Sequence, residues 1–269
     1  PLWWLILNGP ILTFRPSKSG KAYQKIWDKD NHGSPLRKFT INQTSKLKKI
    51  FESYKNISIE YAMRYGTPEI EKTLNKMTKK GCSKILLVPL YPQYAASTSA
   101  TVKDEVFKWM LKQRWQPDLR TIAPWFDNHN YIKALAETVK KNIINKNKLD
   151  KLIVSFHGIP KRYFMAGDPY HCHCIKTARL LKEELKWPDD KILVTFQSRF
   201  GPEPWLQPYT DETIINLAKQ GQKNIAVVAP GFISDCLETL EEINVEAREL
   251  FIENGGESFE YIPCLNDNE

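Results

Sequence analysis

A histidine at the end of an apolar run is the first residue of this sequence that could carry chemistry. His157 follows the apolar residues 152–156 and precedes Gly158. Such a run is typical of a buried strand, so His157 is expected at the strand's carboxyl end. A neutral imidazole can accept a proton near pH 7 or bind a metal ion. A lone histidine can also be structural, and its position alone does not decide between these roles.

A row of carboxylates is the second candidate. Asp235, Glu238 and Glu242 are spaced three and four residues apart, which predicts that they share one face of a helix capped by Ser234 or Asp235. Such a row could pass a hydrated divalent cation inward or carry protons outward. The alternative is an acidic first turn stabilised by the helix dipole.

Two further motifs leave a choice between binding and structure. The proline-rich loop 201–210 carries Trp205 and Tyr209 and suits a flat apolar ligand, or is packed by its own tryptophan. The run 171–174 reads His-Cys-His-Cys, but a single C-x-C lacks the second cysteine pair of most structural zinc and iron–sulfur sites. Cys172 and Cys174 are therefore either ligands of a metal or cluster, or reduced thiols.

Short buried strands alternate with amphipathic helices along the chain. Strands are expected at residues 57–63, 84–89, 152–156, 192–196 and 225–229, and helices at 69–77, 175–185 and 213–218. This alternation predicts an α/β fold with a mostly parallel sheet.

An internal similarity predicts two related halves. Arg64-Tyr65-Gly66 and Arg199-Phe200-Gly201 each follow an expected strand, and the segments 81–89 and 221–230 resemble each other at nearly the same separation. We expect Rossmann-like halves at residues 1–145 and 146–269, each a parallel sheet flanked by helices. A ligand would bind in a cleft between them, at the carboxyl ends of the strands. Chance similarity of short segments is the alternative.

Composition excludes several classes of protein. Apolar residues make up 42% of the 269 residues, and no apolar run is long enough to span a membrane. The net charge of +8 comes mainly from scattered lysines, which indicate a solvated surface or a basic face for an anionic partner. No nucleic-acid-binding motif accompanies the charge. An odd number of cysteines, five, and no export signal favour a reducing cytosol over a disulfide scaffold.

Taken in order, several motifs resemble the ferrochelatase family in its Gram-negative bacterial form. They are Arg64-Tyr65-Gly66, the segments 90–94, 155–160, 167–170, 196–205, 208–213 and 231–242, and Leu265-Asn266-Asp267. The resemblance covers nearly the whole chain. It implies two Rossmann-like halves around a porphyrin cleft and the insertion of Fe²⁺ into protoporphyrin IX to form protohaem, a lyase reaction that ends haem biosynthesis.

The resemblance also implies roles for individual residues. His157 would be the active-site histidine that binds the metal ion or accepts a pyrrole proton, and Glu238 would face it across the porphyrin as a second catalytic and metal-binding residue. Asp235 and Glu242 would belong to an acidic path for metal ions and protons. The porphyrin pocket would be lined by Arg64, Tyr65, Ser198 and Trp205.

The sequence departs from the family pattern at several points. The family's first strand and last helix are missing, so we expect a fragment whose porphyrin site is incomplete at its start. Cys236 stands where many relatives have histidine, and we assign it no essential role. Some relatives carry a [2Fe-2S] cluster, to which Cys172 and Cys174 could belong; no cofactor is expected to be required. The apolar residues 2–7 correspond to the lip of the family's cleft and indicate peripheral contact with the inner membrane.

Two other functions stay open, and a third is disfavoured. One is a chelatase that loads cobalt or nickel into another tetrapyrrole, and another is a tetrapyrrole-binding protein without catalysis. The third is a two-lobed solute-binding protein of the periplasmic type, which would need an export signal that this sequence does not show. The sequence does not predict whether the substrate is protoporphyrin or coproporphyrin. It also does not predict the natural metal or the oligomeric state.

Overall fold

The amino-terminal part of the chain forms a two-stranded parallel sheet packed with helices. A computed structural model describes residues 20–27, 33–143 and 148–268. After a helical segment at residues 20–26, the elements are α3 (Pro35–Ile50), α4 (Ile70–Lys79), β1 (Lys84–Leu87), the π-helical turn η2 (Ala96–Ala100), α5 (Thr101–Leu111) and β2 (Asp118–Thr121). β1 pairs with β2 from Lys84 opposite Asp118 to Leu87 opposite Thr121.

The remainder of the chain forms a four-stranded parallel sheet in the order β4-β3-β5-β6. Its elements are α6 (His129–Asn142), β3 (Lys151–His157), α7 (Lys161–Met165), α8 (Tyr170–Leu185), η3 (Asp189–Lys191), β4 (Ile192–Gln197), α9 (Thr210–Lys219), β5 (Asn224–Val228), α10 (Leu237–Leu240), the π-helical η4 (Glu242–Ala247), α11 (Arg248–Glu253) and β6 (Ser258–Ile262). Parallel pairing leaves the carboxyl ends of β3 and β4 together, with His157 opposite Gln197. The residues that follow these strands are thereby brought to one edge of the sheet.

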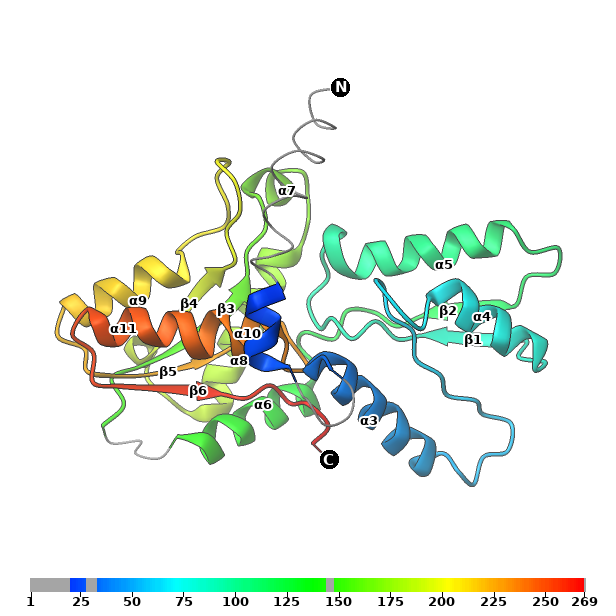
Figure 1. Ribbon diagram of the computed structural model, residues 1–269, viewed down its shortest axis with the longest axis horizontal. Coiled ribbons are helices and arrows are strands. Elements are labelled where there is room, and N and C mark those ends of the chain that lie inside the picture. Colours follow the sequence, from blue (N-terminus) through cyan, green and yellow to red (C-terminus); the bar gives the residue numbers. More distant parts are fainter. Residues whose placement is uncertain (1–19, 28–32, 144–147, 269) are drawn as a thin grey trace.

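Both faces of the four-stranded sheet are covered by helices, which explains why its inner strands carry apolar residues on both faces. Along β3, Leu152, Val154 and Phe156 pack in one buried cluster with α6 and α8, whereas Ile153 packs in a second cluster with α9 and α11. Figure 1 shows these two pairs of helices on opposite sides of the strands. A strand buried on both faces is held rigidly, so β3 is a firm support for His157.

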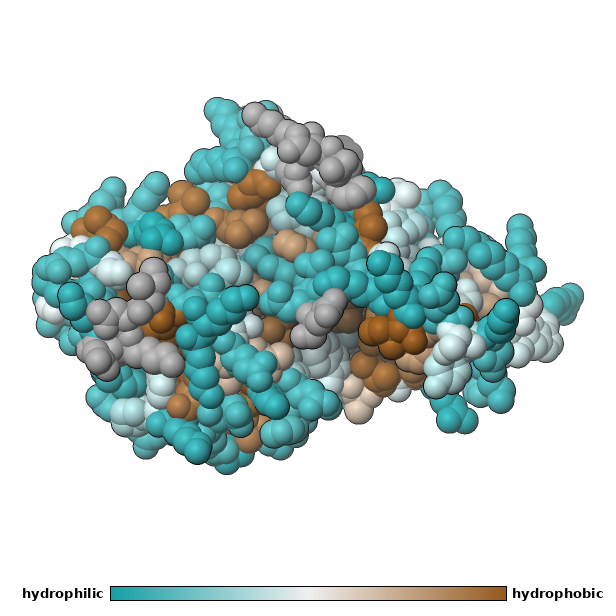
Figure 2. Space-filling view, turned by 90° about the horizontal axis from the view of Figure 1, so that it is seen from below, coloured by the Kyte–Doolittle hydropathy of each residue, from teal (hydrophilic) through white to brown (hydrophobic). Residues whose placement is uncertain are grey.

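The two-stranded sheet has a smaller core and an exposed edge. Leu74, Ile85, Val106 and Trp109 form its buried cluster. Leu86, on the other face of β1, is 61% exposed, and Val88 and Leu90 are also exposed. Figure 2 shows separate hydrophobic patches on an otherwise hydrophilic face of the molecule. None of the described helices combines the length and the apolar character needed to cross a bilayer.

The predicted α/β fold with parallel sheets flanked by helices is confirmed. The strand predicted at residues 57–63 is wrong: within it only Met63 pairs, in a single bridge with Glu69, because no described strand lies alongside to accept its hydrogen bonds. The short strands β2 and β6 and the helices α3, α5 and α6 were not predicted. The division at residue 145 stays a prediction. Helix α6, which precedes it, packs against α8 in the larger core.

Candidate active site

His157 presents one ring nitrogen to the site and uses the other to fix its orientation. Its Nδ1 lies 2.6 Å from the carbonyl oxygen of Gly158. A carbonyl only accepts hydrogen bonds, so Nδ1 carries the proton and the Nε2 of the neutral ring keeps its lone pair. The ring is half-buried and lies between Trp205 and Phe232, with centroid distances of 6.3 and 6.5 Å. His157 can therefore accept a proton or donate a lone pair to a metal ion.

Glu242 lies at the edge of the sheet with both carboxylate oxygens bonded. The backbone N–H of Ser198 donates to Oε1 at 2.7 Å, and the Ser198 hydroxyl donates to Oε2 at 2.6 Å. Burial raises the pKa of Glu242, and the hydrogen bonds from Ser198 and Gln197 oppose this rise. Ser198 was predicted to line the porphyrin pocket, and Glu242 to belong to the acidic path. The structure shows that Ser198 binds Glu242 through two hydrogen bonds.

Gln197 ties the strand that carries His157 to the helix that carries Glu238. Its side chain is buried, and its Oε1 accepts a hydrogen bond from Ser155 of β3 at 2.8 Å. Its Nε2 donates to the carbonyl oxygen of Glu238 at 2.8 Å and to Oε2 of Glu242 at 3.3 Å. This one amide therefore fixes the spacing between β3, β4 and the start of α10.

Glu238 is a half-buried residue in the first turn of α10. Desolvation chiefly raises the pKa of Cys236, and the charge of Glu238, together with a hydrogen bond between the two side chains, raises it further. The same charge contributes to the raised pKa values of Tyr23 and Tyr91, for which burial is again the larger cause. Cys236 and both tyrosines therefore keep their protons at neutral pH.

Asp235 does not lie on the same helix face as the two glutamates. The N-cap of α10 is Cys236, not Ser234 or Asp235, so Asp235 precedes the helix. Its buried carboxylate accepts hydrogen bonds from the Tyr261 hydroxyl, from Thr239 at 3.2 Å and from Asn266 at 2.7 Å. These contacts occupy the oxygens of Asp235, and the prediction of one continuous helical row of three carboxylates is wrong.

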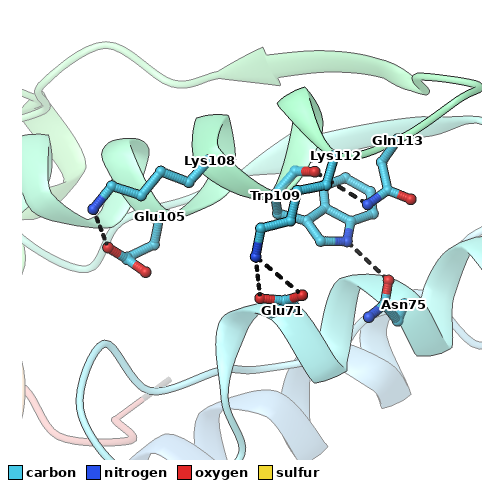
Figure 3. Close-up of polar contacts among 7 residues, drawn as sticks. All are labelled: Glu71, Asn75, Glu105, Lys108, Trp109, Lys112 and Gln113. Atoms are coloured by element: carbon cyan, nitrogen blue, oxygen red, sulfur yellow. Dashed lines mark hydrogen bonds and ion pairs between the residues drawn. The ribbon is translucent and has the colours of Figure 1, made fainter.

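The loop that carries Arg64 and Tyr65 belongs to the smaller sheet. The Arg64 guanidinium lies 4.5 Å from the centroid of the Tyr65 ring and 3.6 Å from Glu105, and its buried Nε has no hydrogen-bond partner among the described residues. Tyr65 is 75% exposed. Figure 3 shows Glu105 paired with Lys108 on α5, beside the contact of Trp109 with Asn75 that packs α5 on α4. Arg64 and Tyr65 also influence the pKa of Tyr91, which connects this loop to the surroundings of Glu238.

Comparisons with known proteins agree with these motifs. A family model described as Ferrochelatase matches residues 1–269. This chain belongs to the ferrochelatase family. Among curated members, the ferrochelatase of Allorhizobium ampelinum is 56% identical over 267 residues, which cover 99% of this chain and 78% of that protein. The ferrochelatase of Rhizobium meliloti is 55% identical, with 99% and 79% coverage.

A solved structure supports the fold of this ferrochelatase-family chain. The structure described as SirB from Bacillus subtilis with Fe³⁺ superposes with a TM-score of 0.57 and covers 86% of each chain. Its sequence identity is 19%, so the similarity concerns the fold alone. It agrees with the parallel sheets flanked by helices described above.

The Cys172–Cys174 motif does not fit a shared cluster in this ferrochelatase-family structure. Both residues lie in α8, where Cys172 is exposed and Cys174 is fully buried. His171 stacks on Phe196 and His173 on Phe126, so the four side chains point to different surroundings. Among the described residues, no three His, Cys, Asp or Glu side chains are grouped so that they could hold a metal ion.

Several residues at the site were not predicted. Gln197 lies within a motif that carried the resemblance, but nothing in the sequence indicated which atoms it bonds. Tyr23 and Lys25 come from a segment without a motif of its own, whereas Glu241 lies within the motif 231–242 but was given no role. The position of Glu241 directly before Glu242 was the only available signal.

Proposed function

We propose that this chain inserts Fe²⁺ into protoporphyrin IX to form protohaem, as the ferrochelatase name of its relatives implies. The observation that supports this function best is the arrangement at one sheet edge of an imidazole with a free Nε2 and two glutamates tied together by Gln197. Iron insertion needs these two kinds of group. One must remove pyrrole protons, and the other must carry a divalent cation.

His157 is proposed as the proton acceptor and as a metal ligand. A porphyrin loses two pyrrole N–H protons when the metal ion enters, so the balanced reaction releases two protons for each Fe²⁺ bound. Only the Nε2 of His157 is free for these roles, because its Nδ1 is already committed to Gly158, so Nε2 accepts one proton after the metal ion has left it for the porphyrin. The exposed side of the half-buried ring can then return that proton to water.

Glu238 and Glu242 are proposed to deliver the metal ion and remove the second proton. Carboxylate oxygens bind Fe²⁺ without holding it as firmly as a complete cysteine or histidine site would. A metal that must be handed to the porphyrin is best held by few ligands, and we propose His157 and Glu238 as that pair. Glu242 is the next carboxylate on the proposed path. Asp235 is not required for delivery, because its oxygens already accept protein hydrogen bonds.

The porphyrin is proposed to lie against residues from both sheets. Trp205 offers an aromatic ring beside His157, and its buried indole N–H has no partner among the described residues. Arg64 offers a cation suited to a propionate, and Tyr65 offers an exposed ring. Ser198 contributes to the site by holding Glu242 in place with two hydrogen bonds. A location in the cytosol with peripheral contact to the inner membrane remains a proposal, and residues 2–7 lie outside the described residues.

The experiment is metal insertion by the purified chain with protoporphyrin IX and Zn²⁺, a redox-stable substitute for Fe²⁺, followed by fluorescence. We expect His157→Ala and Glu238→Ala each to lower turnover at least about 100-fold, the scale of lost acid–base catalysis. The matched controls are His129→Ala and Glu257→Ala, which change exposed residues away from the site. Porphyrin binding without insertion by the unaltered chain would favour a binding protein. Repeating the assay with Co²⁺ and Ni²⁺ tests the other chelatase functions.

A further inference from the structure

A short helical segment lies against the helix that carries Glu238. Residues 20–26 are helical, and Figure 1 shows them in dark blue beside α10. The ammonium group of Lys25 in this segment lies 2.9 Å from Oε1 of Glu241, the residue that follows α10. This ion pair joins two segments that are far apart in the sequence.

The two partners differ in their exposure to water. Glu241 is 7% exposed, whereas the side chain of Lys25 is about half exposed. A buried carboxylate is costly without a cation, so Glu241 attracts Lys25 more strongly than a surface glutamate would. The hydrogen bond and charge of Glu241 are the main causes of the raised pKa of Lys25, and Glu249 and Glu246 add to the effect. The ammonium group of Lys25 therefore keeps its charge at neutral pH.

The ion pair places the segment close to Glu238. Glu241 follows Glu238 by three residues, so Lys25 attaches the segment within one helical turn of that carboxylate. Tyr23 lies two residues before Lys25 and packs edge-on against Trp27, with their ring centroids 6.2 Å apart. The segment thus forms a wall beside a proposed catalytic carboxylate.

We propose that Lys25 and Glu241 are positioning residues whose ion pair holds the segment 20–26 against α10, so that this segment forms one wall of the porphyrin site next to Glu238. This inference rests on the proposed function for its effect on porphyrin, but not for the attachment of the segment. The pair touches neither the metal ion nor the reacting nitrogens. It acts by closing one wall of the site.

The first experiment measures protoporphyrin binding and Zn²⁺ insertion for Lys25→Met, Lys25→Arg and Glu241→Leu. We expect Lys25→Met and Glu241→Leu each to raise the Kd and the KM for porphyrin at least about fivefold, with kcat changed less than about twofold, because the chemistry is untouched. Lys25→Arg keeps the charge and should remain within about twofold of the unaltered chain. The control is Lys72→Met, which removes an exposed ion pair of similar length with Glu69 on α4.

The second experiment needs no porphyrin. Hydrogen exchange of the peptide covering residues 20–27 should be at least about tenfold faster in Lys25→Met and Glu241→Leu, and unchanged in Lys72→Met. Unchanged exchange in either variant would overturn the inference, as would a kcat loss without a rise in KM. The two assays also separate this inference from the proposed function. If the unaltered chain neither bound nor metallated porphyrin, the proposed function would be contradicted. Faster exchange in the variants would still support the role of the ion pair in holding the segment.

Discussion

Glu242 combines a carboxylate that is partly shielded from water with hydrogen bonds that favour its charge. Burial is the larger effect and raises its pKa, while Ser198 and Gln197 oppose the rise. A folded-state pKa above the unfolded value means that ionisation costs stability. The contribution of Glu242 to stability is therefore greatest below the ordinary glutamate pKa of 4.5 and is lost as the pH rises through the raised value.

Glu242→Gln should remove this pH dependence. We expect the free energy of unfolding of the unaltered chain, relative to the Gln variant, to fall between about pH 4 and pH 7, as measured by urea unfolding at several pH values. Glu257→Gln changes an exposed glutamate and should give a flat difference. A difference that rises with pH would show that the hydrogen bonds from Ser198 and Gln197 outweigh burial.

At the scale of secondary-structure elements, Gln197 is the residue that joins three of them. Gln197→Met keeps the volume but leaves the Ser155 hydroxyl and the Glu238 carbonyl without this partner. We expect a loss of about 1–3 kcal/mol in the free energy of unfolding, together with lower turnover, because α10 is no longer tied to β3. Gln220→Met, at the exposed end of α9, should change the free energy by less than about 0.5 kcal/mol. Equal stability of the two variants would contradict the role of Gln197.

The elements that could be predicted are those whose own residues determine them. The runs that become β1, β3, β4 and β5 are apolar and short, and the histidine after β3 was expected at the sheet edge where it lies. The strand at residues 57–63 was wrong because a strand also needs a neighbour, which a local pattern does not reveal. The turn of π-helix at η4 likewise has no signature in the spacing of Glu238 and Glu242.

The site was predictable in its residue types but not in its bonds. His157, Glu238 and Glu242 were singled out by type and position, whereas the partners of Asp235 come from Tyr261 and Asn266 at the end of the chain. Contacts between residues so far apart depend on how β6 leaves the sheet. Sequence spacing carries no information about them.

At the scale of the whole molecule, α3 connects the smaller sheet to the larger one. Gln43 donates to the carbonyl oxygen of Asn266 at 2.6 Å and to Ser234 at 3.0 Å, and Lys48 pairs with Glu60 in the segment before α4. Figure 1 shows α3 between the two sheets. The position of Arg64 relative to Glu238 therefore depends on this helix.

Gln43→Ala should weaken that connection. We expect a loss of about 1–2 kcal/mol in the free energy of unfolding from the two hydrogen bonds removed, measured by denaturant unfolding. Lys49→Ala, on the exposed side of the same helix, should be nearly neutral. If both variants lost the same amount, helix propensity rather than the connection would explain the effect.

Ser198 adopts a left-handed backbone conformation, with a φ of 63°, and uses both its backbone N–H and its hydroxyl on Glu242. Glycine would accept that conformation without offering a hydroxyl, and threonine would offer a hydroxyl on a β-branched side chain that disfavours the conformation. Asparagine tolerates the backbone but places an amide where a hydroxyl is needed. Position 198 therefore has almost no acceptable alternative to serine.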